Sequence, residues 1–183
     1  MSNSAYVSAA KPKVGGALYR APIGTTLPTD ATSALDAAFE SLGYISQDGL
    51  TNANSPNSST IYAWGGDPVL TTTSEKEDTF KCVLLEVLNV AVLKTTYGDD
   101  NVTGTLATGI HVKANNNERD NYSYVAEMDM RGGVAKRIVL PNASISAVDD
   151  IVYKDSDASG YGLTFSCEPD SGGDTHHEYI KGA

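Results

Sequence analysis

The sequence predicts a mainly β protein, a β-sandwich or partly closed barrel with one main α-helix, an extended N-terminal arm and a long loop. Seventeen glycines among 183 residues, with abundant Thr, Ser and Asn, favour many short strands and turns over a helix bundle. Apolar and polar residues alternate along several segments of the second half. With 40% hydrophobic and 20% charged residues, the chain can bury a core of its own. We therefore expect a single domain over residues 1–183.

The N-terminal segment is predicted to be extended. Residues 1–15 show no apolar period and contain Lys11-Pro12-Lys13, so a flexible arm is expected there. A turn follows at residues 24–30, where Pro28 removes a backbone donor and prevents a continuing strand ladder.

A short helix is expected after this turn. Its apolar residues recur at helical spacing over residues 35–42, and Thr32 or Ser33 can cap its first turn. Gly43 stands where a left-handed residue ends a helix. Residues 44–46 are then predicted to form a short strand.

A long mobile loop is predicted over residues 48–60, which are rich in Asn, Ser, Pro and Gly. Strands are expected over residues 61–64 and 69–81, with a Gly-Gly-Asp-Pro turn at 65–68 between them. The apolar run at residues 80–93 fits both a helix and a strand. The prediction is a strand that ends near Leu85, then a helix from about Glu86 to Tyr97 that stops at Gly98 and packs on a sheet.

The second half is predicted to be strand after strand. Arg131-Gly132-Gly133 supplies the positive-φ residues of a tight reversal, and Pro141-Asn142 is expected to break a strand. A loose polar tail is expected over residues 169–183. The expected strands are residues 110–113, 122–130, 135–140, 144–148, 151–154 and 160–167.

Charge and cysteine content limit the possible functions. The net charge of −10 argues against a nucleic-acid-binding surface, because such surfaces cluster Lys and Arg. The sequence has no run of about 18 apolar residues, so no membrane span is expected. No secretory signal pattern is seen at the N-terminus, which predicts folding in a cytoplasm and makes Cys82 and Cys167 buried, reduced thiols.

Calcium-binding patterns in the sequence are incomplete. Asp155-Ser156-Asp157-Ala158-Ser159-Gly160 resembles the opening of a calcium loop, but its twelfth position holds Ser166 instead of a bidentate Glu. Asp99-Asp100-Asn101 also lacks a closing ligand. Turns are the preferred interpretation of both.

The histidines are also interpreted as structural or as parts of a polar tail. His176 and His177, with Asp174 and Glu178, could bind a metal ion, but adjacent residues of an extended chain point in opposite directions. His111 stands alone on a predicted strand. We predict no enzyme, no catalytic residue, no metal and no cofactor, since motifs for nucleophilic hydrolysis, phosphate binding or dinucleotide binding are missing from the sequence.

Two further patterns leave alternatives open. Arg20, Arg119, Arg131 and Arg137 are scattered, which suits intersubunit salt bridges as well as simple solubility. Ten tyrosines against three phenylalanines suit an interface, a solvated sheet or a sugar-binding face.

Three segments carry a resemblance to a known family. Residues 16–50 (GALYRAPIGTTLPTDATSALDAAFESLGYISQDGL), the strand-to-helix segment from Phe80 to Gly98, and RIVLPNASIS from Arg137 to Ser146 resemble the major tail, or tail tube, proteins of long non-contractile-tailed bacteriophages. The tube protein of a contractile device is a close relative that the sequence leaves open.

The resemblance implies a structural subunit of the virion tail, assembled in the bacterial host cytoplasm. It would form hexameric rings that stack head to tail, with the loop at 48–60 in the ring-stacking contacts. Its partners would be further copies of itself and the tape-measure, terminator and distal tail proteins. DNA would pass through an acidic bore without specific binding. The alternative is a carbohydrate-binding or capsid-decoration β-sandwich module.

Overall fold

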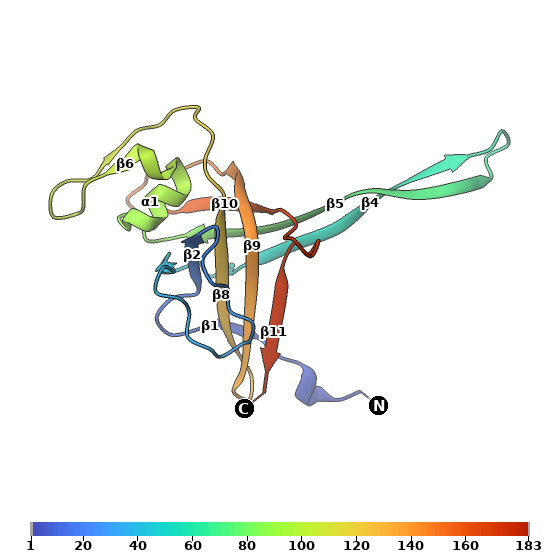
Figure 1. Ribbon diagram of the computed structural model, residues 1–183, viewed down its shortest axis with the longest axis horizontal. Coiled ribbons are helices and arrows are strands. Elements are labelled where there is room, and N and C mark those ends of the chain that lie inside the picture. Colours follow the sequence, from blue (N-terminus) through green and yellow to red (C-terminus); the bar gives the residue numbers. More distant parts are fainter. Residues whose placement is uncertain (1, 183) are drawn as a thin grey trace.

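The computed structural model describes residues 2–182, with every side chain among them except those of Asn57 and residues 73–76. Within that part of the chain nine strands form one antiparallel sheet, in the order β3-β2-β8-β9-β10-β5-β4, with β1 on β8 and β11 on β9 (Figure 1). Strands β6 and β7 form a separate pair. The bounds are β1 (Ala10–Pro12), β2 (Leu18–Pro22), β3 (Glu40–Ser41), β4 (Thr51–Tyr62), β5 (Pro68–Leu84), α1 (Val90–Tyr97), β6 (Val102–Thr103), β7 (His111–Val112), β8 (Tyr122–Met130), β9 (Val134–Val148), β10 (Tyr161–Cys167) and β11 (His177–Lys181).

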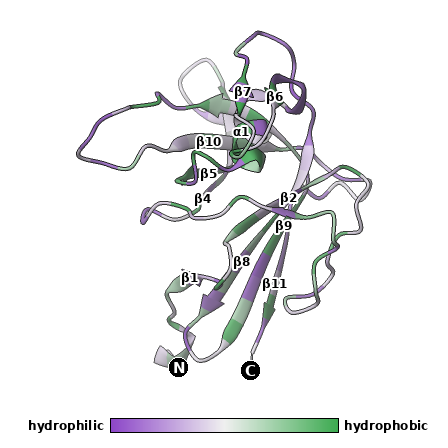
Figure 2. Cartoon of the chain, turned by 90° about the vertical axis from the view of Figure 1, so that its left-hand side faces the viewer, coloured by the Kyte–Doolittle hydropathy of each residue, from purple (hydrophilic) through white to green (hydrophobic). Residues whose placement is uncertain are grey.

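The sheet turns a corner along β9. The first half of β9 pairs with β8 and β11, and its second half pairs with β10, which continues to β5 and β4. Figures 1 and 2 show the β10-β5-β4 part running across the direction of β8, β9 and β11. The two parts enclose the core, where the rings of Tyr124 and Phe165 pack edge to face with their centroids 4.8 Å apart. The mainly β sandwich prediction is confirmed, and the sheet does not close into a barrel.

The prediction that Pro141-Asn142 breaks a strand is wrong, because β9 runs through both residues. The register between β8 and β9 shifts opposite Ser123, from Tyr122↔Ala143 to Tyr124↔Leu140. This bulge accommodates the missing N–H of Pro141, and the Pro141 carbonyl accepts a 2.7 Å hydrogen bond from the Ser123 hydroxyl.

The predicted helix over residues 35–42 is also wrong, since that segment forms turns and then β3. The Asp30 carboxylate accepts 2.6 Å hydrogen bonds from the backbone N–H groups of Thr32 and Ser33, which lower its pKa to about 2. Asp36 caps Ala38 in the same way at 2.9 Å. These local bonds satisfy the donors that a helix would have used.

The end of this segment is bonded to the core. Leu42 is completely buried, and its N–H donates to the Leu18 carbonyl at 2.9 Å. Gly43 has a φ of 72°, and a Cβ there would overlap the Glu86 carboxylate. The positive φ was expected, but it ends β3 rather than a helix. Residues 44–46 form a single bridge, Ile45 to Leu84, instead of the predicted strand.

The predicted loop at 48–60 is corrected to a strand, because β4 covers most of it. β4 pairs with β5 from Thr51↔Lys81 to Tyr62↔Pro68, and the hydroxyls of Thr60 and Thr71 meet across the ladder at 3.1 Å. Its Ser residues and Asn54 are exposed on a two-stranded ribbon, where polar side chains on both faces remain in water.

The C-terminal tail also differs from the prediction. β11 pairs with β9 from His177↔Val139 to Lys181↔Ala135, so most of residues 169–183 is part of the fold. At the N-terminus, β1 adds to β8 although residues 2–14 are exposed. Met1 and Ala183, the outer ends of these predicted segments, lie outside the described residues.

Other elements match their predictions closely. β8 has the expected bounds, and Gly132 and Gly133 have φ values of 80° and 76° in the reversal that follows. β10 begins one residue after the predicted start. Residues 151–154, in contrast, form no strand.

The helix α1 ends where it was predicted to end. It starts later than the predicted Glu86, because the Asn89 side chain accepts a 2.9 Å bond from the Ala91 N–H and so caps it. Gly98 ends it with a φ of 94°. Its buried residues include Val92 and Leu93, which join the core.

Candidate assembly interface

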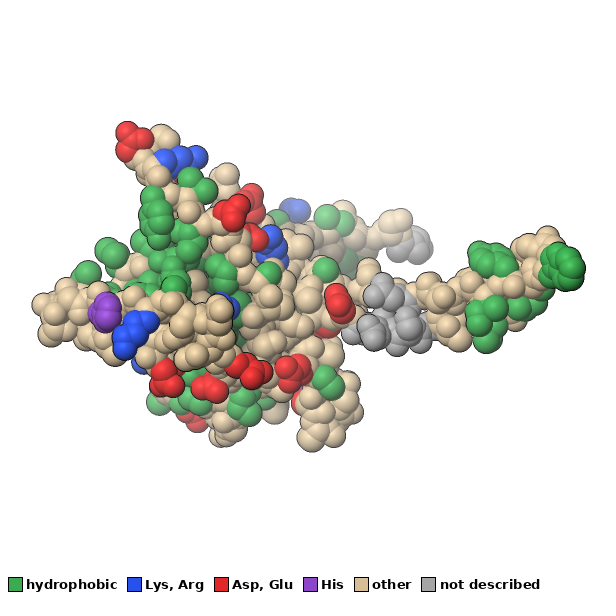
Figure 3. Space-filling model, turned by 90° about the horizontal axis from the view of Figure 1, so that it is seen from above, with side chains coloured by type: hydrophobic (Ala, Val, Ile, Leu, Met, Phe, Trp, Pro, Cys, Tyr) green, Lys and Arg blue, Asp and Glu red, His purple; other side chains and the backbone are tan. Residues whose placement is uncertain are grey.

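The largest projecting feature is the β4–β5 hairpin, which extends far from the body of the molecule (Figure 1). Its end is apolar, as the hydrophobic side chains at the far end of the hairpin in Figure 3 show. We define the hairpin tip patch as the residues there that are more than half exposed: Ile61, Tyr62, Trp64, Val69 and Leu70. Exposed apolar patches of this kind mark surfaces that bind other proteins.

The hairpin is fixed to the body at its root by the buried Asp78 carboxylate. Asp78 accepts hydrogen bonds from Asn52 on β4 at 2.8 Å, and from Thr175 and the His176 ring Nδ1, both at 2.5 Å. Its side chain is 0% exposed. Burial would raise the pKa of Asp78, but the hydrogen bonds from Thr175, His176 and Asn52 outweigh it and lower that pKa below its usual value. The segment before β11 is therefore bonded to the hairpin root.

The sheet has two open edges near the β8–β9 reversal. There β1, β8, β9 and β11 form a four-stranded antiparallel part of the sheet, in that order. Among the described residues, β1 pairs only with β8 and β11 pairs only with β9. The β11 edge therefore presents a row of backbone donors and acceptors to a further strand, and the three-residue β1 edge presents a shorter one in which Pro12 offers only its carbonyl.

Two of the four scattered arginines are buried inside the subunit. Arg137 contacts Glu127, with its Nε 3.0 Å from the carboxylate, and also donates to the Asp30 carbonyl at 2.7 Å. Arg20 bonds Asp99 at 2.9 Å and Glu40 at 3.2 Å. Both guanidinium groups are at most 2% exposed. The suggestion that these arginines form intersubunit salt bridges or a soluble surface is wrong for Arg20 and Arg137, since their partners are internal.

The four residues considered for a metal site are brought together only in part, since Asp174 and His177 lie close to each other while His176 and Glu178 have other partners. His176 bonds Asp78, while Glu178 pairs with Lys136 at 2.9 Å. Asp174 and His177 instead meet Asp170, with one potential ligand atom of each within 4.8 Å of the others. Asp170 already accepts bonds from the His177 ring at 3.2 Å and from two backbone N–H groups of its own turn.

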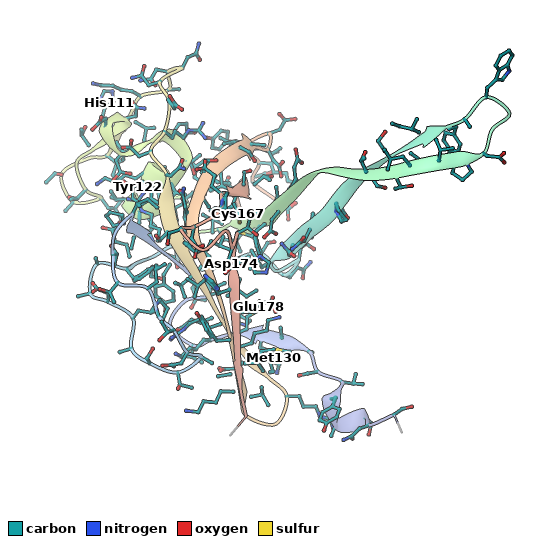
Figure 4. All side chains as sticks on the ribbon, turned by 45° about the vertical axis from the view of Figure 1, so that its right-hand side comes forward. His111, Tyr122, Met130, Cys167, Asp174 and Glu178 are labelled. Carbon is teal, nitrogen blue, oxygen red and sulfur yellow. The ribbon has the colours of Figure 1, made fainter. Side chains whose placement is uncertain are left out.

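The remaining site candidates lie apart from one another. His111 is exposed on β7, far from Asp174 and Glu178 (Figure 4). Residues 155–158 are exposed. Asp99, from the second acidic pattern, binds Arg20.

The two cysteines are buried and free, as expected. Burial raises the pKa of each thiol to about 12, so neither is a reactive thiolate at neutral pH.

Comparison with known protein families identifies the chain. A family model described as phage tail tube protein matches residues 1–181. The chain belongs to the phage tail tube protein family. It is thus a structural subunit of the tail tube, part of the virion tail, as the resemblance in its sequence implied. A search of curated proteins found no match.

This tail tube protein has no helix, among the residues described, that is long and apolar enough to cross a membrane. Its most prominent surfaces are backbone edges and an apolar hairpin tip, which suit contacts between proteins.

Sequence reasoning missed the full length of the hairpin, although a signal for its end was present. The apolar residues at 61–64 and 69–70 on both sides of a Gly-Gly-Asp-Pro turn predict two strands and a reversal, and the structure has this turn between β4 and β5. The root of the hairpin gave no such signal, because Asn52, Asp78 and His176 are distant in the sequence.

Proposed function

We propose that this tail tube protein, as a single domain over residues 1–183, assembles into hexameric rings that stack head to tail. The stacked rings form a passive, acidic conduit through which DNA leaves the capsid, and the protein catalyses no reaction. The observation that carries this proposal is the four-stranded part of the sheet with its two different open edges, β1 and β11.

The strand directions in this sheet suit a closed ring. Each strand from β1 through β8 and β9 to β11 is antiparallel to its neighbour. With four strands per copy, β1 of the next copy would lie antiparallel to β11, so the alternation continues across every subunit boundary. Because β1 and β11 are different surfaces, this contact is heterologous and generates a ring when the rotation closes.

The size of such a ring suits a channel. Six copies with four strands each would give 24 strands, and a spacing of about 4.8 Å gives a circumference of about 115 Å before strand tilt is added. Barrels of 16–18 strands already leave an aqueous channel. Closure would also remove the exposed edges, which in a free subunit invite aggregation.

The hairpin is assigned to stacking between rings. It projects from the body and ends in the hairpin tip patch, which a second copy would cover. Such contacts are open-ended, so tube length would be set by other tail proteins: the tape-measure and terminator proteins, with the distal tail protein at the tip. The proposal includes assembly in the host cytoplasm and a non-contractile tail.

Charge supports the passive role toward DNA. Each copy carries a net charge of −10, so six copies carry −60. A bore that shares this acidic excess repels phosphate and gives DNA no surface to bind.

Negative-stain electron microscopy over a concentration series tests the proposal. We expect hollow rings or tubes of uniform width, with six-fold symmetry in end views. A second sample carries Ile180→Pro in β11, which removes a backbone donor from the open side of this edge strand and is expected to abolish rings and tubes. The matched control is Val152→Pro, in an exposed segment that forms no strand. Discrete monomers with saturable binding on a glycan array would instead favour the carbohydrate-binding alternative.

A further inference from the structure

The hairpin tip patch needs a partner that its own subunit does not supply. Trp64 is fully exposed, and Ile61, Tyr62, Val69 and Leu70 are each more than half exposed around it. The ladder with β5 continues from Thr51 to Tyr62, so twelve residues at about 3.3 Å each place the tip about 40 Å from the hairpin root. A paired ribbon of this length does not fold back on its own body, as Figure 1 shows.

A cavity on the body has the chemistry to receive this tip. It has a volume of about 420 Å³ and lies between β1, β8 and the segment at 45–50. That volume falls in the range of cavities that hold small organic groups. Its apolar lining includes Ala17, Ile45, Leu50, Ala126 and Met128.

The polar rim of the cavity complements the tip. Lys11 lines one wall and makes no ion pair with any residue that the structure describes. Asp67, the one charged residue of the tip between Ile61 and Leu70, also has no ion pair among the described residues. Gln47 and Asp48, from the segment at 45–50, also line the cavity and offer oxygen acceptors, which the indole N–H of a buried Trp requires.

We propose that the hairpin tip of one copy docks into this cavity of a second copy, with Trp64 as the anchor and Asp67 beside Lys11. The inference rests on the proposed tube assembly and names the two surfaces that join successive rings. Since β1 forms a wall of the cavity and is also the proposed lateral edge, ring closure and ring stacking share one element. A Trp in an apolar cavity with a polar rim is a common anchor of protein interfaces.

Trp64 is the single tryptophan of the chain, so its fluorescence reports directly on the tip. Emission and acrylamide quenching are followed while the full-length protein assembles, with light scattering and electron microscopy on the same samples. We expect the emission to move to shorter wavelength and the quenching constant to fall severalfold as particles form. If the protein assembles while the acrylamide quenching constant of Trp64 stays at its value for the free subunit, the docking is refuted but the proposed tube is not. Wild-type protein that stays monomeric at the highest attainable concentration would contradict the tube itself.

Variants separate the cavity from other apolar surfaces. Leu50→Lys places a charge in the cavity, and we expect Trp64 of this variant to stay accessible to acrylamide at all protein concentrations. Leu88→Lys, at an exposed residue outside the cavity, should behave as wild type. Asp48→Lys on the exposed rim provides a second test that does not disturb the core.

Cross-linking gives an independent readout. Equal amounts of Asp67→Cys and Lys11→Cys proteins are mixed and treated with a short bismaleimide, since the natural cysteines are buried. Cross-linked dimers are expected in this mixture and not when Leu88→Cys replaces Lys11→Cys. Equal yields in both mixtures would refute the assignment.

Discussion

At the scale of single residues, the carboxylate of Asp78 determines how the hairpin root is held. It has no exposure to solvent and accepts bonds from β4 and from the segment that leads into β11. One side chain joins two segments that are far apart in the sequence. Both its protonation and its replacement should therefore lower the free energy of unfolding.

The pH dependence of stability is expected to carry the signature of Asp78. Its folded-state pKa is lowered below the usual 3.8, so the stabilisation is fully present above 3.8 and is lost as the pH falls through the folded value. Asp78→Asn leaves buried partners imperfectly paired and should cost about 1–3 kcal/mol near neutral pH. Urea unfolding at a series of pH values measures both effects, because the variant should also lose part of the acid-dependent slope.

The control for this experiment is Asp155→Asn, at an exposed residue in a segment without strand structure. It should unfold as the wild type does at every pH. If Asp78→Asn gives the same curve as this control, the carboxylate does not hold the hairpin root.

Arg137 is expected to be far more sensitive to substitution than an exposed arginine. Its guanidinium is 1% exposed and neutralises Glu127, whose other cation is Lys13 at 3.0 Å. Arg137→Met would leave a buried carboxylate with one partly exposed cation, and we expect a loss of about 3–5 kcal/mol in unfolding free energy. Arg131→Met, in the exposed β8–β9 turn, should change it by less than about 0.5 kcal/mol. A loss for Arg137→Met as small as the one for Arg131→Met would show that the buried pair is dispensable.

Residues such as these could not be found from the sequence. The sequence shows four arginines but not which of them are buried. The acids that pair with Arg20 lie 20 and 79 positions away, and the acid that pairs with Arg137 lies 10 positions away on the neighbouring strand. Cys82 and Cys167 could be predicted as buried, reduced thiols because the N-terminus shows no secretory signal pattern.

At the scale of elements, the spacing of apolar residues predicted the strands and the helix that bury one face in the core. β8 was predictable because apolar residues alternate along it and a Gly pair follows, and the end of α1 was predictable from Gly98. β4 was not, because Ser, Thr and Asn on a ribbon solvated on both faces have the composition of a loop. The bulge at Pro141 depends on Ser123 of the partner strand, which no local pattern contains.

The C-terminal strand gives the sharpest test at this scale. Amides of β11 that bond to β9 are expected to exchange with solvent more than about tenfold slower than those of residues 151–159, which corresponds to an opening free energy of more than about 1.4 kcal/mol. Hydrogen exchange followed by mass spectrometry or NMR on the free subunit measures this. Exchange at the same rate in both segments would favour the loose C-terminal tail that the sequence predicts.

At the scale of the whole molecule, two kinds of contact compete with charge. Strand pairing at β1 and β11 and apolar burial at the hairpin tip patch depend little on salt, whereas the net charge of −10 per copy opposes every association of like subunits. The internal ion pairs of Arg20 and Arg137 use cations that could otherwise have bridged subunits. The balance between attraction and repulsion should therefore be set by ionic strength.

Assembly is expected to strengthen as salt is added. Raising the ionic strength from about 0.01 M to about 1 M shortens the Debye length from about 30 Å to about 3 Å, so repulsion between neighbouring copies is screened while backbone and apolar contacts persist. Sedimentation velocity at a fixed protein concentration should show a growing fraction of large particles across this range. Sucrose at matched viscosity is the control, since it screens no charge. Dissociation of the particles by salt would mean that ion pairs between subunits hold the tube together, and would contradict an assembly built on strand edges and the hairpin tip patch.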